Sequence, residues 1–278
     1  MLLAVALAVL AQADGGLDAG VPGSRVIVRA PDGGLPPAGL SCLPTWYAGT
    51  VKYKADAGGW GIELETGLFL DWGSPDGGAH VDPDDPDSEE IPDLADIYDP
   101  PYVSGPIVPL DVSDAGSIVD PGRARVEQLF LATYGSKRDE VQERLGRVRF
   151  FGLRYPFHER AAEALRRVVA RLEPQVKANP KLLPFLKDIG GTWIWRTIKR
   201  SKRLSAHAFG IAIDLNVELS NYWRWTYRGH PMVWKNRVPQ EIVDAFEAEG
   251  FIWGGRWIHF DTMHFEYRPE LLSPLCRE

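Results

Sequence analysis

The sequence changes character at Pro121, and this change limits what the chain can fold into. Between residues 55 and 122 there are 17 Asp and Glu and no Lys or Arg, and the later part of this stretch is rich in Pro and Asp. Proline fixes φ and removes a backbone donor, so we expect this part to be mostly irregular. After it, apolar residues recur at helical spacing. The sequence therefore predicts a folded domain over residues 121–278 behind an acidic β/irregular region over residues 41–120.

The chain begins with an apolar run, MLLAVALAVLAQA, that ends in the small-x-small triplet Ala11-Gln12-Ala13. This is the layout of a signal peptide over residues 1–13, although no Lys or Arg precedes the run. An apolar N-terminus without that role is the alternative. The run is too short to span a bilayer. Residues 14–40, rich in Gly, Asp, Ala and Pro, are predicted to form a flexible linker. We expect a secreted or periplasmic protein with no membrane span.

Short apolar runs follow Cys42, notably Gly49–Tyr53 and Gly61–Leu70, and they are typical of strands. Cys42 and Cys276 lie near the two ends of the chain. In an exported protein they can form a disulfide that joins these ends, but two free thiols fit the sequence equally well.

The formal net charge of −7 is the sum of two unlike parts. Residues 123–278 hold 27 Lys and Arg against 18 acidic residues, a balance of +9. A basic domain behind an acidic segment indicates an anionic partner or an internal acidic mask over a basic cleft. The run Asp82–Glu90 is most simply a solvated loop, and a calcium site is the alternative, although the ligand order of an EF-hand loop is absent.

Apolar periodicity predicts several helices in the C-terminal domain. A stripe from Ala161 to Leu172 is typical of a surface helix that Glu173-Pro174 ends or kinks. Pro239 is expected to start another helix, which Gly250 stops. Further helices are predicted around Arg125–Tyr134, Arg138–Val148 and Lys181–Ile189, and strands over Gly210–Val217 and Met263–Tyr267. Together these elements predict an α+β fold, with a small antiparallel sheet packed by helices.

The first chemical motif is Ser205-Ala-His207-Ala-Phe-Gly210-Ile-Ala-Ile-Asp214. On a helix, seven residues rise about 10.5 Å, too far for His207 and Asp214 to bind one ion about 2 Å from each. On an unbroken strand, the odd spacing sends the two side chains to opposite faces. They converge only if the backbone turns between them, and Gly210 suits such a turn. We expect Ile211–Leu215 to be a buried strand that delivers Asp214.

The second motif is Asp261-Thr-Met-His264-Phe-Glu266. His264 offers a ligand nitrogen, and a carboxylate three residues away can act as a base beside a metal without binding it. Three protein ligands plus water form the open arrangement of a catalytic zinc, and two distant Cys exclude a Cys-rich structural site. Mixed His and Asp ligation also favours zinc over calcium or magnesium, which prefer oxygen ligands. Phe265 and Tyr267 are expected to face the core.

The order Ser-x-His-x-x-Gly-x-Ala-x-Asp, followed by carboxylate-x-x-His, resembles the M15 family of zinc peptidases over roughly residues 120–270. That family includes D-alanyl-D-alanine carboxypeptidases and dipeptidases and L-alanyl-D-glutamate endopeptidases. The resemblance implies a Hedgehog/DD-peptidase-like fold, Zn²⁺ as cofactor and the stem peptides of peptidoglycan as substrate. It also implies that His207, Asp214 and His264 bind the zinc and that Asp261 is the general base, where many members have Glu.

The family also places an arginine upstream of the first motif, where it polarises the scissile carbonyl. Arg196 is the best match, with Arg200 and Arg203 as nearby alternatives. Ser205 is expected to be a hydrogen-bonding, substrate-side neighbour of the site rather than a nucleophile, because the metal already activates water.

Several other residues near the motifs have two interpretations. Trp223 and Trp225 are candidates for substrate binding, although most tryptophans of this region belong to the core or to cleft walls. Glu266 rivals Asp261 as base and can instead orient a ligand histidine. His259 either contacts the site or is structural. The other histidines are expected to be structural: His80, His158 and His230.

These inferences predict a secreted zinc metallopeptidase, D-Ala-D-Ala carboxypeptidase-like or endopeptidase-like, that hydrolyses peptidoglycan stem peptides. The alternative is a non-catalytic cell-wall-binding module that retains the fold, which the presence of Asp261 disfavours because binding alone does not need a base. A zinc hydrolase for the amide between sugar and peptide is a third interpretation. We expect a monomer that binds no nucleic acid.

Overall fold

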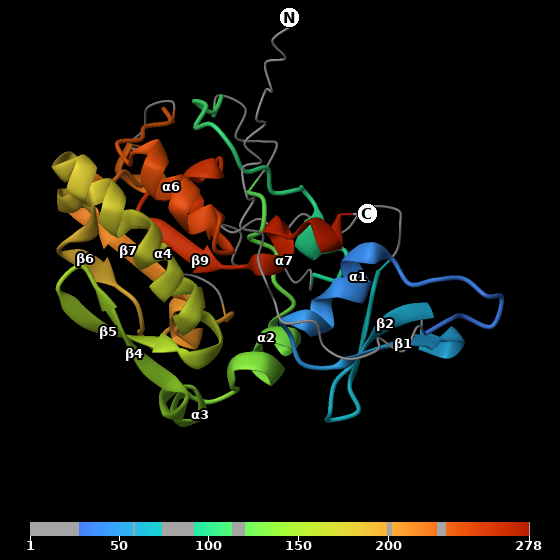
Figure 1. The fold of residues 1–278 in the computed structure, drawn as a ribbon. Helices are drawn as coiled ribbons and strands as arrows, with labels where there is room; N and C mark the ends of the chain where they lie inside the picture. Colours follow the sequence, from blue (N-terminus) through green and yellow to red (C-terminus); the bar gives the residue numbers. More distant parts are fainter. Residues whose placement is uncertain are drawn as a thin grey trace, which may run out of the picture.

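The computed structural model describes residues 28–57, 59–73, 92–112, 120–198, 202–226 and 232–277. Within these ranges the chain forms three small antiparallel sheets packed by helices, which confirms the α+β class (Figure 1). The predicted signal peptide and the acidic run Asp82–Glu90 lie outside the described residues. Among the residues described, no helix has both the length and the apolar character needed to cross a membrane.

The largest sheet has four strands in the order β6-β7-β9-β8, all antiparallel. Its strands are β6 (Ile189–Gly191), β7 (Ala212–Asn216), β8 (Phe251–Trp253) and β9 (His264–Tyr267). Helices α4 (Glu159–Ala178) and α6 (Gln240–Glu247) lie beside it and against each other (Figure 1). Phe246 of α6 stacks on Phe265 of β9 with ring centroids 4.2 Å apart. As expected, Phe265 is fully buried and Tyr267 packs against the same core.

Of the two outcomes predicted at Glu173-Pro174, an end or a kink, the structure excludes the end of helix α4. The helix continues four residues beyond Pro174 to Ala178. A proline inside a helix removes one backbone hydrogen bond and crowds the preceding turn. Here the hydrogen bond that Pro174 removes belongs to the last turns of the helix. Val176, which follows Pro174, still packs against the core.

The helix predicted over Arg138–Val148 is wrong in its second half. Helix α3 (Arg138–Glu143) ends early, and β4 (Leu145–Phe150) then pairs with β5 (Leu153–His158) in a two-stranded hairpin. Buried Val148 and Phe150 alternate with exposed residues, which is the period of a strand. The helix predicted over Lys181–Ile189 is a 3₁₀ helix, η4 (Pro180–Leu186), followed by β6.

The N-terminal region contains the predicted strands in a sheet of three. The run Gly61–Leu70 divides into β2 (Gly59–Glu63) and β3 (Phe69–Asp71) around a turn, and β1 (Thr50–Lys54) pairs with β2. The described residues of this region form no separate core, because one buried apolar cluster extends from Leu40 to Leu271. The remaining helices are α1 (Ala38–Cys42), α2 (Glu127–Tyr134), α5 (Trp223–Thr226), α7 (Pro269–Leu272) and the 3₁₀ helices η1 (Leu43–Thr45), η2 (Ala55–Ala57), η3 (Asp96–Tyr98), η5 (Ala206–Phe209), η6 (Val217–Leu219), η7 (Gly254–Arg256) and η8 (Pro274–Cys276).

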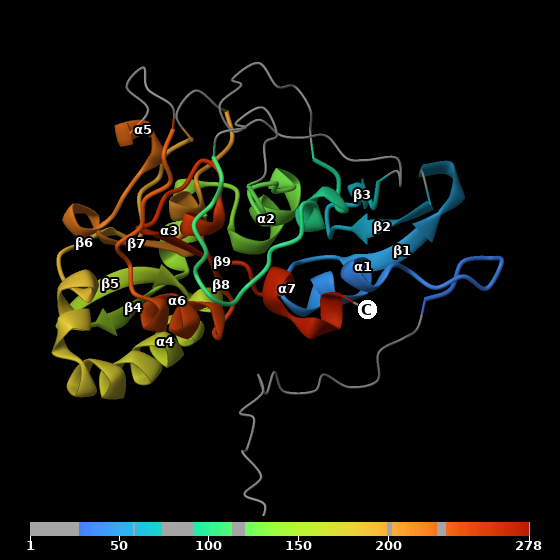
Figure 2. The same ribbon diagram turned by 90° about the horizontal axis from the view of Figure 1, so that it is seen from above.

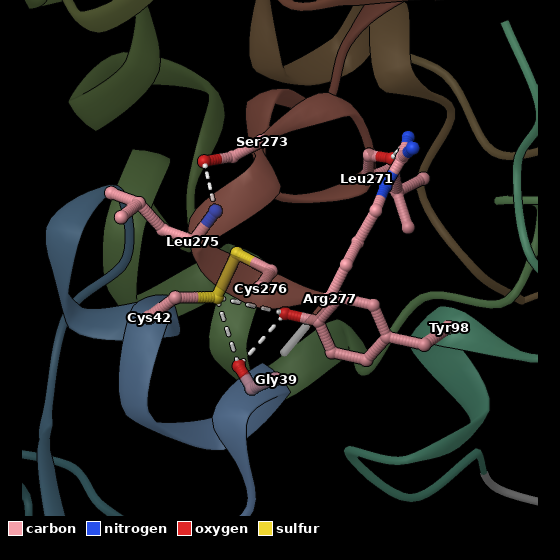
Figure 3. The surroundings of a disulfide bond; sticks show 8 residues. All are labelled: Gly39, Cys42, Tyr98, Leu271, Ser273, Leu275, Cys276 and Arg277. Carbon is pink, nitrogen blue, oxygen red and sulfur yellow. Dashed lines mark hydrogen bonds between the residues drawn. A yellow bond between two sulfur atoms is a disulfide. The ribbon is translucent and has the colours of Figure 1, made fainter.

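A disulfide between Cys42 and Cys276 joins the N-terminal region to the end of the chain. It links α1 to η8, and α1 lies beside α7 in both ribbon views (Figure 2). Tyr98 covers the bridge: its hydroxyl donates to the carbonyl of Gly39 at 2.8 Å and lies 3.3 Å from Cys42 Sγ (Figure 3). Of the two alternatives that the sequence left open, the structure has the paired form.

Candidate metal centre and active site

The turn at Gly210 brings the first motif together. His207 lies on η5, and Gly210 then adopts the left-handed conformation, with φ of 68°, before β7 begins. A Cβ at Gly210 would lie 2.6 Å from Leu145 Cδ2 and would carry a strained φ. The glycine therefore allows both the reversal of direction and the close approach of the β4–β5 hairpin. As expected, Asp214 then lies on a strand whose other residues are largely buried.

Asp214 and His264 are directly opposite each other on the neighbouring strands β7 and β9. The Oδ1 atom of Asp214 lies 2.9 Å from Nδ1 of His264 and 3.2 Å from Nε2 of His207. The candidate ligand atoms of all three residues lie within 4.8 Å of one another. The structure thus brings together the three residues that the sequence assigns to one metal ion.

The donor set fits a zinc ion. The Nδ1 atom of His207 lies 3.1 Å from the carbonyl oxygen of Thr192, so this nitrogen carries the proton and Nε2 presents a lone pair. His207 Nε2 is buried and has no hydrogen-bond partner of acceptable geometry among the described residues, despite its proximity to Asp214. A buried imidazole lone pair without a donor is costly, and a cation between two imidazoles and a carboxylate satisfies it.

The electrostatics of the three residues also favour a positive charge at their centre. Burial acts to raise the pKa of Asp214, but the nearby ring of His207 and the hydrogen bond with His264 outweigh it and hold the pKa well below its usual range. Burial acts to lower the pKa of His264, but hydrogen bonds to Asp214 and Glu266 raise it to about 10. Without a metal, His264 therefore keeps a proton, whose positive charge compensates the carboxylate of Asp214. A divalent cation supplies the same positive charge.

Asp261 lies at the edge of the same pocket. Its backbone amide donates to the carbonyl of Gly254 at 2.9 Å, and its own carbonyl accepts from the amide of His264 at 3.1 Å. Burial, and then the negative charge of Asp214, raise the pKa of Asp261 to about 6. Its Oδ1 atom is buried and has no hydrogen-bond partner among the described residues. A carboxylate in this condition is suited to accept a proton near neutral pH.

Glu266 contacts the ring nitrogen of His264 that does not face Asp214. Its Oε2 atom lies 3.2 Å from Nε2 of His264, which leaves Nδ1 of that ring for the metal side. Burial acts to raise the pKa of Glu266, but Arg125, His264 and Arg268 hold it well below its usual range. A permanent carboxylate beyond a ligand histidine fixes the ring and its tautomer. This geometry suits Glu266 to the orienting role that the sequence left as an alternative to that of base.

The segment 120–125 completes the pocket, and the sequence contained no motif that marked it. Arg268, fully buried, donates to the carbonyl of Gly122 and to that of Ala124 at 3.4 Å. Trp257 Nε1 donates to the carbonyl of Pro121 at 2.9 Å. These bonds hold the segment beside β9, so that Arg123 and Arg125 line the pocket.

The pocket is a cavity of about 180 Å³ with a strongly basic wall. Its arginines come from four parts of the chain: Arg123, Arg125, Arg196, Arg203 and Arg224. Arg196 and Ser205 both line it, as proposed from the sequence, and the amide of Ser205 donates to the carbonyl of Arg196 at 3.0 Å. The alternative Arg200 lies outside the described residues. Arg123, Arg125 and Arg224 were missed because they lie far from the motifs or carry no recognisable spacing.

The two candidate tryptophans do not line this cavity. Trp223 is buried, with its ring edge-on to His259 at 4.7 Å, while Trp225 is 47% exposed and contacts the ring of Tyr222. Tyr222 itself lines the pocket. Substrate binding by Trp223 and Trp225 therefore stays a prediction. His259 also lines the pocket, and its Nδ1 lies 2.9 Å from Asp120.

Residues 199–267 match the family model described as D-alanyl-D-alanine carboxypeptidase, of the M15 type. This segment belongs to the M15 peptidase family. The M15 segment contains the His–Asp–His cluster and Asp261, but not the Arg123–Arg125 wall or Arg196. No solved structure matches the chain.

Proposed function

We propose that this protein is an exported zinc metallopeptidase that hydrolyses peptide bonds in the stem peptides of peptidoglycan. The observation that carries the proposal is the position of Asp261, whose carboxylate has a buried Oδ1 atom and a raised pKa, in the same pocket as the His207–Asp214–His264 cluster. A ligand cluster alone fits a structural metal, but a base beside it is needed only for chemistry.

His207, Asp214 and His264 would hold the zinc, whose Lewis acidity makes a water molecule nucleophilic near neutral pH. Asp261 Oδ1, buried and without a partner, accepts the proton of the attacking water and passes it to the leaving amine. Arg196 supplies positive charge to the carbonyl oxygen as its negative charge develops. Glu266 keeps the ring of His264 in the orientation that binding requires.

The basic wall supports an acidic peptide as substrate. Stem peptides end in a carboxylate and contain acidic residues, and guanidinium groups bind carboxylates in paired hydrogen bonds. The bond that is cleaved is either the one before a terminal D-alanine or an internal bond of the peptide. Analysis of the reaction products distinguishes the two. Export rests on the N-terminal apolar run and agrees with the disulfide, which is characteristic of oxidising compartments.

The test is digestion of purified muropeptides of known structure, with and without a zinc chelator, read by mass spectrometry. Release of terminal D-alanine identifies a carboxypeptidase, and internal cleavage identifies an endopeptidase. We expect products only in the metal-loaded samples. A zinc-loaded protein that leaves every muropeptide intact but binds them would instead establish the non-catalytic wall-binding module.

A further inference from the structure

A second charged surface lies on the β4–β5 hairpin, away from the catalytic pocket. Four arginines form it: Arg147 and Arg149 on β4, Arg154 on β5 and Arg166 on α4. We call them the arginine face. They line an open hollow of about 600 Å³ between the hairpin and α4, which lie side by side in Figure 1. This hollow shares no lining residue with the catalytic pocket.

The strand register concentrates positive charge on one side of the hairpin. Arg149 is directly opposite Arg154, and Arg147 lies two residues before Arg149, on the same side. The intervening Val148 and the following Phe150 point into the core. Like charges directly opposite each other on paired strands destabilise the pair. Without a ligand, the arginines of the paired strands therefore repel each other, and a bound anion would remove this repulsion.

Nearby acidic groups only weakly offset this charge. Among the described residues, Arg147, Arg149 and Arg154 form no ion pair, and each is exposed. Arg166 pairs with Glu163 at 3.0 Å, but both side chains are well exposed, so the pair contributes little. Glu173 is the one acidic residue that lines the hollow in the part of the chain described. Four guanidinium groups and one carboxylate leave a net positive surface.

The turn of the β4–β5 hairpin, at Phe151 and Gly152, also lines the hollow. Phe151 has a positive φ of 36° and is followed by Gly152 at 114°, so a bulky residue occupies a backbone region that rarely accepts one. The ring of Phe151 contacts that of Phe150 edge-on at 5.1 Å and lines the hollow beside the arginines. The arginines are thus held on a short, tightly turned hairpin rather than on a long loop.

We propose that the arginine face binds a phosphate-bearing polymer other than nucleic acid. Guanidinium groups match phosphate oxygens in paired hydrogen bonds, and several arginines in a row suit a chain of anions better than one small ion. Nucleic acid shares this charge, but among the described residues a single aromatic ring, Phe151, lines the hollow, where a surface for single strands typically has several stacking rings. Such binding would hold the enzyme on an anionic matrix while the catalytic pocket, on another surface, stays open to peptide.

Binding of fluorescent inorganic polyphosphate to the full chain tests the proposal, in chelator so that catalysis plays no part. We expect Arg149→Gln/Arg154→Gln to weaken binding about tenfold or more, and added salt to weaken wild-type binding. The matched control, Lys181→Gln/Lys187→Gln, removes the same charge from exposed sites elsewhere and should keep wild-type affinity within about twofold. The arginine variant should unfold at the same temperature as wild type or higher, because repulsion is relieved.

Three results would overturn the proposal. Equal loss in the arginine and lysine variants would mean a general charge effect. Orthophosphate that displaces the polymer at equal phosphate concentration would mean a site for the free ion. Single-stranded DNA that binds as tightly as polyphosphate would mean a nucleic-acid surface. None of these outcomes bears on the peptidase proposal, because muropeptide hydrolysis is measured separately.

Discussion

His264 Nε2 lies 3.2 Å from Oε2 of Glu266, two residues further along the same strand. The two side chains share a face of β9 because side chains on a strand alternate. Since the other ring nitrogen of His264 faces Asp214, the carboxylate of Glu266 decides which nitrogen is free for a metal. The alternation of side chains along β9 thus places a candidate metal ligand beside the carboxylate that contacts its ring.

Replacement of Glu266 by Gln should weaken zinc binding by about 10- to 100-fold, because the ring of His264 loses its charged acceptor. Competition with a chromogenic chelator measures the affinity. The control is Glu163→Gln, which removes a surface carboxylate with no contact to the site. Unchanged zinc affinity in Glu266→Gln would show that the orienting contact has no energetic role.

His158 should make the protein acid-sensitive. Its Nε2 lies 3.1 Å from the carbonyl of Tyr134, and its Nδ1 accepts the amide of Arg160 as the N-cap of α4. Burial lowers the pKa of His158 to about 4. Between about pH 6.5 and 4, His158 is therefore protonated in the unfolded chain but neutral in the folded chain. The free energy of unfolding consequently falls as the pH falls.

This group alone should cost about 2 kcal/mol of the free energy of unfolding between pH 7 and pH 5. Urea unfolding at the two pH values measures it, with His158→Gln as the non-titrating control whose pH dependence should be smaller. NMR titration of the ring provides a direct check. A His158 that titrates near pH 6.5 in the folded protein would contradict the assignment.

Loss of the disulfide should destabilise the whole molecule, because the bridge closes a sequence separation of 234 residues. Chain entropy predicts a loss of up to about 5 kcal/mol in Cys42→Ser/Cys276→Ser, with smaller values usual in practice. Chemical unfolding of this variant against wild type gives the difference. Equal stability of the two proteins would show that the bridge adds nothing to the fold.

The His207–Asp214–His264 cluster could be predicted because its geometry is local to two motifs. A turn at Gly210 is the one way for His207 and Asp214 to converge, and the structure contains it. The part of the basic wall formed by Arg123 and Arg125 could not be predicted, because these residues lie on a segment without a pattern that Arg268 and Trp257 hold beside the pocket. Likewise, the segment from Leu145 to Phe150 has too few residues for its strand period to outweigh the helical propensity before it.

The most direct test of the proposed function is to measure zinc content and muropeptide turnover together in Asp261→Ala. Bound metal is counted by elemental analysis and turnover by mass spectrometry of products, with His264→Ala as the variant that should lose metal. We predict that Asp261→Ala keeps one zinc per chain, as wild type does, while turnover falls by about 10²- to 10⁴-fold. Wild-type turnover in zinc-loaded Asp261→Ala would contradict the assignment of Asp261 as the base.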